Sequence, residues 1–306
     1  MTYDQEKLPL VSVIINNYNY GHFLGEAIDS VLNQTYPYIE IVVVDDGSTD
    51  NSREIISSYQ EKIISVLKEN GGQASAFNAG FVASRGDIIF MLDSDDIFVP
   101  EKVAEVVNIF EQYQDIGWCF NRLRFVDAKT NTFIKLSSES GSRLCDLRTD
   151  TKNGKMSFQA PATSGLCFKR SLLQMILPMP EIIIITSDNY LKVAAIALSK
   201  GYFLDKQLSF LRLHNNNNYT ARSNNQSGKA KVAILTAYCV RKNWPFLAKS
   251  ANKLFSRGLG IAWKVGGLEA EATQIIKSYI STVSPLERLE INLRAFYNCL
   301  KVEKYL

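Results

Sequence analysis

Acidic, amide and aromatic side chains gather at three points of this 306-residue chain, each directly after a run of apolar, mostly β-branched residues. These points are Asn16–Asn19, Asp45–Ser48 and Asp93–Asp96. Carboxylates that crowd together repel one another unless a cation or a proton relieves them. Their oxygen atoms suit hard divalent cations, so the Asp93–Asp96 segment predicts a site for Mg²⁺ or Mn²⁺.

The carboxylates of this segment are too few to enclose an ion completely. An ion held by so few protein ligands usually shares its other positions with water and substrate phosphates. The pattern therefore indicates a metal-bound nucleoside diphosphate, with Tyr18 offering a flat face to a base and Asp46 accepting a hydrogen bond from it. A calcium loop of the EF-hand type is excluded, because Phe98 and Ala104 occupy the places that need Gly and Glu.

Each motif also has a purely structural interpretation. An Asp-Gly-Ser sequence after a strand is often only a turn or a helix cap, and Asp-x-Asp triplets occur in solvated loops. Tyr18 on its own is more typical of a packed aromatic residue. The functional interpretation depends on all three motifs following strands of one sheet.

The elements that would position these motifs alternate between two periodicities. Continuous apolar runs predict strands, and amphipathic patterns between them predict helices. The strands are expected at 10–15, 39–44, 63–67 and 87–92, and the helices at 23–32, 52–59, 73–84 and 101–113. Such alternation implies right-handed crossovers and a mostly parallel sheet, in which ligands bind beyond the carboxyl ends of the strands.

The rest of the chain is less regular. Two strands at 118–126 and 132–136 are expected to form a hairpin, followed by a long mobile loop at 137–160, a helix at 186–198 and a strand at 203–213. The polar stretch 214–228 predicts a linker. Helices are expected at 229–243, 246–257, 268–283 and 286–300. We therefore expect an α/β domain at 1–222 and a helical, basic region at 223–306.

Composition narrows the classes of protein. The charge is asymmetric, because residues 1–228 hold 21 Lys and Arg against 26 Asp and Glu, whereas 229–306 hold 13 against 5. An acidic site region argues against nucleic acid as a partner. Five scattered cysteines without a CxxC pair, no secretory signal and no long apolar stretch favour a cytoplasmic protein with reduced thiols.

Four segments in order resemble the inverting family 2 glycosyltransferases with the GT-A fold: VSVIINNYNYGHFLGEAIDSVLNQTY, EIVVVDDGSTDNS, ENGGQASAFNAG and GDIIFMLDSDD. The match covers 10–100 with its spacing intact and continues more weakly to about residue 222. The resemblance implies a Rossmann-like GT-A sheet. It also implies transfer of a sugar from a nucleoside-diphosphate donor, with inversion, to an acceptor hydroxyl on a glycan, a lipid-linked carrier or a protein.

The resemblance also assigns roles at the sheet edge. Asn16 and Tyr18 match positions that hold the nucleoside, and Asp45 and Asp46 match the aspartate pair whose second member contacts the base. Two further residues, Asp93 and Asp95, match the D-x-D motif. There Asp95 would be the main ligand of Mn²⁺ or Mg²⁺, and Asp93 would approach both the ribose and the ion.

Further along, Asp188 matches the catalytic base, and Ser187 stands where many members carry a second acid; the alternative is that Asp188 only caps the helix together with Ser187. The pair Arg212 and His214 matches a familial R-x-H pattern. Of the two, His214 either contacts the leaving phosphate or only marks the boundary of the linker. Phe77 replaces a familial arginine. The absence of a Q-x-x-R-W motif and of membrane spans argues against a processive polysaccharide synthase.

Two other functions stay open at this point. A nucleotidyltransferase would need a glycine-rich phosphate loop after the first strand, where this chain has Asn16–Asn19. A degenerate GT-A protein would bind a nucleotide-sugar or a partner without turnover. The basic C-terminal helices are compatible with a solvated face packed on the catalytic domain, with attraction to an anionic membrane surface, or with homo-oligomerisation.

Overall fold

The computed structural model describes residues 8–127, 129, 132–134, 141–155, 158–214 and 225–300. Contacts divide the chain into two compact units, and each is described by itself. The first unit comprises residues 1–146, 159–184 and 198–215, and the second comprises 147–158, 185–197 and 216–306. The predicted boundary between 222 and 223 lies outside the described residues.

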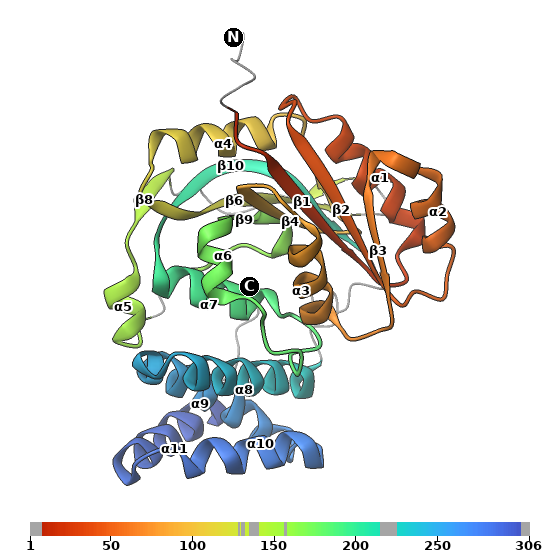
Figure 1. The fold of residues 1–306 in the computed structure, drawn as a ribbon. Coiled ribbons are helices and arrows are strands. Elements are labelled where there is room, and N and C mark those ends of the chain that lie inside the picture. Colours follow the sequence, from red (N-terminus) through yellow and green to blue (C-terminus); the bar gives the residue numbers. More distant parts are fainter. Residues whose placement is uncertain are drawn as a thin grey trace. The chain divides into compact units, whose positions relative to one another are not determined.

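One mixed sheet with strand order β3-β2-β1-β4-β9-β6-β10-β5 forms the centre of the first unit (Figure 1). β7 pairs with β6, and β8 pairs with β10. The strands are β1 (Val11–Asn17), β2 (Ile39–Asp46), β3 (Ile64–Lys68), β4 (Ile88–Asp93), β5 (Ile97–Phe98), β6 (Ile116–Asp127), β7 (Phe133–Ile134), β8 (Arg143–Cys145), β9 (Leu166–Lys169) and β10 (Lys200–Leu213). The helices of this unit are α1 (Gly21–Leu32), α2 (Ser52–Ser58), α3 (Gln73–Ala83), α4 (Lys102–Gln112) and α6 (Arg170–Ile176).

The first four predicted strands form a parallel array, as the alternating sequence pattern indicates. β1 lies between β2 and β4 and is parallel to both, with Asn17 opposite Asp45 and Asn16 opposite Asp93. The carboxyl ends of these three strands therefore meet at one edge of the sheet. The other half of the sheet is mixed, because β9 runs antiparallel to both of its neighbours, β4 and β6.

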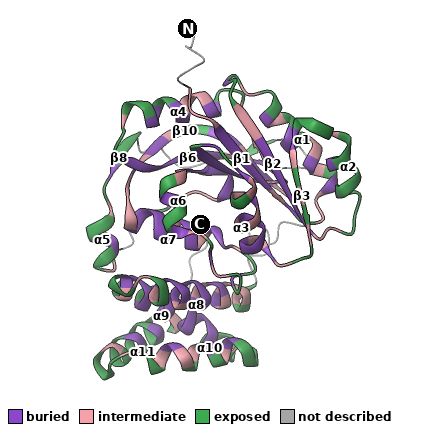
Figure 2. Cartoon of the chain, in the orientation of Figure 1, coloured by how far each residue is buried: buried purple, intermediate pink, exposed green. Residues whose placement is uncertain are grey.

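Helices cover both faces of β1 and β4, which is consistent with their nearly continuous burial, whereas the outer strand β3 alternates between half-buried and exposed residues (Figure 2). Side chains of α1, α2 and α4 form one core with alternate residues of β1, including Val11, Val13 and Ile15. α3 packs on the opposite face. There a Cβ at Gly80 would lie 2.5 Å from the side chain of Ile14, so a small residue permits the close approach of helix and sheet.

Two expectations need correction. The segment predicted as a long mobile loop, 137–160, contains β8 and the short helix α5 (Arg148–Lys152) within its described part. The strand β9 and the helix α6 were not expected either. Short elements such as β8 and β9 take their stability from pairing with neighbouring strands, which local sequence does not reveal. By contrast, the predicted hairpin is confirmed by the pairing of β6 with β7.

The second unit is helical. Its elements are α5, α7 (Asp188–Leu198, the last residue of which belongs to the first unit), α8 (Gln226–Asn243), the 3₁₀ turn Pro245–Leu247, α9 (Ala248–Lys264), α10 (Ala270–Ser281) and α11 (Pro285–Leu300). All four predicted C-terminal helices are present. A polar cluster with one residue from each of them joins α8 to α11: Arg241, Asn252, Tyr279 and Glu287. Hydrogen bonds from Arg241 and other neighbours lower the pKa of Glu287 to about 2.

Gly72, at the start of α3, is expected to resist substitution. Its φ is +84°, and a Cβ there would lie 2.6 Å from the carbonyl oxygen of Ile184. Gly141 has a similar φ of +76° but open space around it. G72A should therefore lower the free energy of unfolding by about 1–3 kcal/mol more than G141A does, because only G72A adds a clash to the backbone strain. Equal losses in urea denaturation of the two variants would contradict this packing.

Candidate active site

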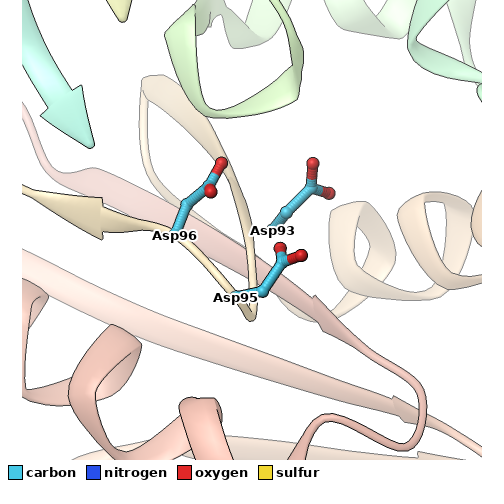
Figure 3. A group of neighbouring side chains, drawn as sticks. All are labelled: Asp93, Asp95 and Asp96. Carbon is cyan, nitrogen blue, oxygen red and sulfur yellow. The ribbon is translucent and has the colours of Figure 1, made fainter. Parts of the chain in front are cut away.

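The turn after β4 brings three carboxylates together (Figure 3). Ligand oxygens of Asp93, Asp95 and Asp96 all lie within 4.8 Å of one another. Asp93 is the last residue of β4, and a hydrogen bond from the amide of Asp96 to its carbonyl oxygen, 3.0 Å long, closes the turn. The charges of Asp93 and Asp95 therefore act on Asp96 at close range.

Asp96 is the buried member of the three, with 2% of its surface exposed. Burial, and then the charges of Asp95 and Asp93, raise the pKa of Asp96 well above its usual value. Its carboxylate accepts hydrogen bonds from the hydroxyl of Ser164 and from the backbone amide of Arg212. The protein thus supplies hydrogen-bond donors to the buried carboxylate of Asp96. The carboxylates of Asp93 and Asp95 are less buried, and we call these two the outer carboxylates.

Lys102 lies beneath this turn and is fully buried. Its ammonium group donates to the carbonyl oxygen of Ser164 and to the hydroxyl of Ser209, and it lies 3.6 Å from the ring centroid of Phe98. Burial lowers the pKa of Lys102 to about 7, although the charge of Asp96 acts in the opposite direction. Ser164 connects Lys102 to the turn after β4, because its hydroxyl also accepts a hydrogen bond from the amide of Asp93 at 3.1 Å.

Arg212 and His214 lie at the end of β10 and reach the same turn. The His214 Nε2 atom is 3.1 Å from Asp95 Oδ2, and the Arg212 guanidinium donates to the carbonyl oxygen of Asp95. The guanidinium also pairs with Glu26 and lies over the ring of Phe23. The R-x-H pair is therefore part of the same cluster as the D-x-D motif.

Asn16 connects β1 to β4. Its side-chain amide donates to Asp93 Oδ1 at 3.0 Å, while its own carbonyl oxygen Oδ1 is buried and meets no donor among the described residues. A buried acceptor without a partner is costly, so it is a natural place for an N–H or O–H of a ligand. Tyr18, two residues further on, is 43% exposed.

Asp46 ends β2 and is nearly buried. Its Oδ1 accepts from Lys68 Nζ at 2.7 Å and from the amide of Gly71 at 3.0 Å, and its Oδ2 accepts from the amide of Gly72 at 2.7 Å. These bonds hold the glycine loop between β3 and α3 against the sheet edge. The carboxylate expected to contact the base thus also shapes the loop beside it.

Asp45, the preceding residue, is completely buried. Burial acts to raise its pKa, but hydrogen bonds from Ser48, Arg53 and Asn17 outweigh burial and leave the pKa below its usual value. Arg53 Nε is 2.9 Å and Asn17 Nδ2 is 3.0 Å from the carboxylate. Asp45 therefore fixes the loop after β2 as a charged, fully bonded anchor.

Asp188 belongs to the second unit and begins α7. It is 5% exposed, and its Oδ2 lies 2.8 Å from Nζ of Lys192 one turn along the helix. Ser187 before it is fully buried. Phe77, which replaces a familial arginine, is also fully buried and contributes to the core of the first unit.

The outer carboxylates fit a hard divalent cation. Asp93 and Asp95 present oxygen atoms within the distance that one ion spans, and carboxylate oxygens are the ligands that Mg²⁺ and Mn²⁺ prefer. The orphaned oxygen of Asn16 next to Asp93 adds a hydrogen-bond acceptor for a ligand bound there. Together they can hold an ion on one side and a polar ring or sugar on the other.

Sequence reasoning missed Lys102 and Ser164 as supports of this site. Lys102 has a local signal, because it lies on the apolar face of its helix with Val103, Val106 and Phe110, all of them buried. A charged residue at such a position indicates a buried polar partner. Ser164 has no comparable signal, since its contacts to Asp96 and Lys102 join residues more than 60 positions apart.

Comparisons with known proteins assign the family. The profile described as "Glycosyl transferase family 2" matches residues 12–174, more than half of the chain. The chain belongs to glycosyltransferase family 2. An uncharacterized glycosyltransferase from Nostoc sp. is 36% identical over 232 residues, which cover 73% of this chain and 72% of the relative. Another from Rickettsia typhi is 42% identical over 132 residues, 42% of this chain and 41% of that relative.

Solved structures agree on the fold. TarS of Staphylococcus aureus, residues 1–349 in complex with UDP-GlcNAc, matches with a TM-score of 0.66 at 16% identity, over 95% of this chain and 89% of that chain. The mannosyltransferase PcManGT of Pyrobaculum calidifontis, in complex with GDP-Man and Mn²⁺, matches with a TM-score of 0.53 at 17% identity, over 98% and 89%. The family 2 glycosyltransferase predicted from sequence, with its GT-A fold, is confirmed.

Lys102 should make the stability of this family 2 enzyme depend on pH. Between about pH 7 and pH 10 the unfolded chain binds a proton at this lysine that the native state does not bind. The free energy of unfolding of the wild type should rise over this window relative to K102M, by at most about 1.4 kcal/mol per pH unit. Urea denaturation at pH 7 and pH 9 measures the difference.

The matched control is K206M, since the Lys206 side chain is 52% exposed and pairs with Glu105 on the surface. Its stability should follow the wild type at both pH values. Parallel pH profiles for wild type and K102M would contradict the assignment of Lys102 as a buried lysine with a low pKa.

Proposed function

We propose that this enzyme transfers a sugar from a nucleoside-diphosphate donor to an acceptor hydroxyl, with inversion, in a metal-dependent and non-processive reaction. The observation that carries the proposal is the turn after β4, where Asp93 and Asp95 present their oxygens beside the unpartnered oxygen of Asn16. This combination offers anionic ligands to a cation and a hydrogen-bond acceptor to a nucleoside at one edge of the sheet.

A divalent ion fits the proposed donor as well as the protein. Asp93 and Asp95 would hold Mn²⁺ or Mg²⁺, which when bound neutralises negative charge on the diphosphate. Two adjacent carboxylates alone would repel a diphosphate, so donor binding at this turn needs a cation. The complex of PcManGT with GDP-Man and Mn²⁺ supports the same combination.

The nucleoside would occupy the tips of β1 and β2. Asn16 offers its buried Oδ1 to an N–H or O–H, and the exposed ring of Tyr18 offers a stacking face. Asp46 would contribute to base recognition while it holds the amides of Gly71 and Gly72. TarS bound to UDP-GlcNAc and PcManGT bound to GDP-Man support a nucleotide-sugar as the donor class.

The proposed reaction needs a base for the acceptor hydroxyl and hydrogen-bond donors for the leaving diphosphate. An acceptor hydroxyl attacks well only if its proton is removed during attack, which requires a carboxylate. The resemblance assigns this role to Asp188. At the other end, Arg212 and His214 beside Asp95 supply hydrogen-bond donors for the leaving diphosphate. Inversion corresponds to a single displacement, in which the acceptor oxygen forms its bond to the anomeric carbon as the bond from that carbon to the diphosphate breaks.

Sequence features support the proposed mode of transfer, and the proposed acceptor classes come from the family resemblance. The chain lacks the Q-x-x-R-W motif of processive synthases. Among the described residues, none of the helices has the length and apolar character to cross a membrane. We propose a single transfer per acceptor, which is a glycan, a lipid-linked carrier or a protein, and a cytoplasmic location.

Removing the outer carboxylates should abolish metal-dependent turnover. D95N and D93N should each lower the release of nucleoside diphosphate in Mn²⁺ by roughly 10²-fold or more, because the ion and the diphosphate lose their anchor. D115N is the matched control, since Asp115 is an exposed carboxylate paired with Lys200. Full activity of D95N, or wild-type activity in a chelator, would contradict metal dependence.

Two variants test whether Asp188 is the base: one removes its charge, and the other removes only its ion pair with Lys192. D188N should lower turnover by about 10²–10⁴-fold and leave donor affinity unchanged, because general-base catalysis is lost while binding stays. K192M removes the ion pair and leaves the carboxylate, so it should retain most of the turnover. If K192M loses as much activity as D188N, Asp188 acts through its ion pair and not as the base.

A further inference from the structure

The last described helix, α11, is apolar on two opposite sides. Ile291 and Ala295 are fully buried, and α11 packs against α9. On the other side six large side chains are between 58% and 81% exposed: Leu286, Leu289, Leu293, Phe296, Tyr297 and Leu300. We call these six residues the outer face of α11. A helix that is apolar all round is normally covered on every side.

The outer face lies at the upper end of the range of apolar patches on ordinary monomers. If a side chain of this size offers about 150 Å² or more, the six together expose on the order of 600 Å². The largest patch on a typical monomer is roughly 300–600 Å², and a stable protein interface needs about 800 Å² from each partner, part of it polar. The outer face with its polar rim thus reaches the size that a dimer requires.

The spacing of the outer face is that of a coiled-coil seam. Leu286, Leu289, Leu293, Phe296 and Leu300 follow one another at steps of three, four, three and four residues. This is the a/d pattern of two consecutive heptads, which packs best against another helix of the same kind. A helix that lies on a membrane also carries an apolar stripe, so the charges of α11 are needed to distinguish the two partners.

Charged residues flank one side of the seam. Glu290 takes an e position next to the seam and pairs at 2.8 Å with Arg294 at a b position further from it, whereas Asn292 and Cys299 line the other edge. A partner helix therefore meets the apolar seam, with Glu290 at its rim.

The described charges of α11 are also wrong for a lipid surface. Glu287 and Glu290 balance Arg288 and Arg294. Helices that lie on anionic membranes carry mainly Lys and Arg on the polar side. We propose that the outer face of α11 binds the same face of a second copy of this chain, as a helix pair related by a two-fold axis.

The inward side of α11 is independent of this contact. Glu287 bonds to Arg241 and Asn252 inside the unit, so the helix is anchored by its other side. Substitutions on the outer face should therefore change association and leave folding intact. The proposal also does not rest on catalysis, and its test needs neither donor nor acceptor.

Sedimentation velocity of the full chain over a range of micromolar concentrations tests the proposal. The wild type should sediment as a dimer, and L289E/L293E as a monomer with an unchanged thermal midpoint, because charges cannot be buried in an apolar seam without a large cost. M175E is the matched control. Met175 is 61% exposed on α6 in the first unit, so this variant should stay dimeric.

A monomeric wild type at every concentration would overturn the proposal, as would a dimer that persists in L289E/L293E. Binding of a monomeric wild type to vesicles of anionic phospholipid would overturn it in favour of a membrane contact.

Discussion

Repulsion among three carboxylates at the tip of β4 is the interaction on which the structure of the site depends. Asp93, Asp95 and Asp96 have ligand oxygens within 4.8 Å of one another at the edge of an apolar sheet. On the inner side Ser164 and the amide of Arg212 bond to Asp96, and on the outer side Asn16 donates to Asp93 while His214 lies 3.1 Å from Asp95. Asp93 and Asp95 keep their oxygens at the outer side of the turn, where a cation and a diphosphate complete the balance of charge in the proposed reaction.

The acidic residues at the end of β2 have different partners from those at the end of β4. Asp45 and Asp46 follow β2 just as Asp93 follows β4, yet both are bonded to backbone amides and basic side chains of this unit. They fix the loops after β2 and β3, so that the tips of β1 and β4 present Asn16 and Asp93 in a defined register. In the proposed function Asp45 only holds its loop, whereas Asp46 holds the neighbouring loop and also contacts the donor, as Asp93 and Asp95 do.

The sequence predicted the parallel strands and the edge where they end, because each strand is a continuous apolar run and the rule for ligand sites in parallel sheets is general. It did not predict β9 or the buried pair Lys102 and Ser164, since these depend on contacts between segments far apart in the chain. It also predicted which carboxylates gather, but not which donors bond to them. That Asp46 holds the amides of Gly71 and Gly72 follows from loop geometry alone.

The central claim is that Asp93 and Asp95 hold a divalent ion together with the diphosphate of the donor. Electron paramagnetic resonance of free Mn²⁺ tests it most directly, because the signal of the free ion falls as the ion binds. We predict that the wild type with a nucleoside diphosphate removes Mn²⁺ from solution in a one-to-one ratio, and that D95N with the same nucleotide removes no more than the nucleotide alone. Equal depletion by the wild type and D95N would contradict the account.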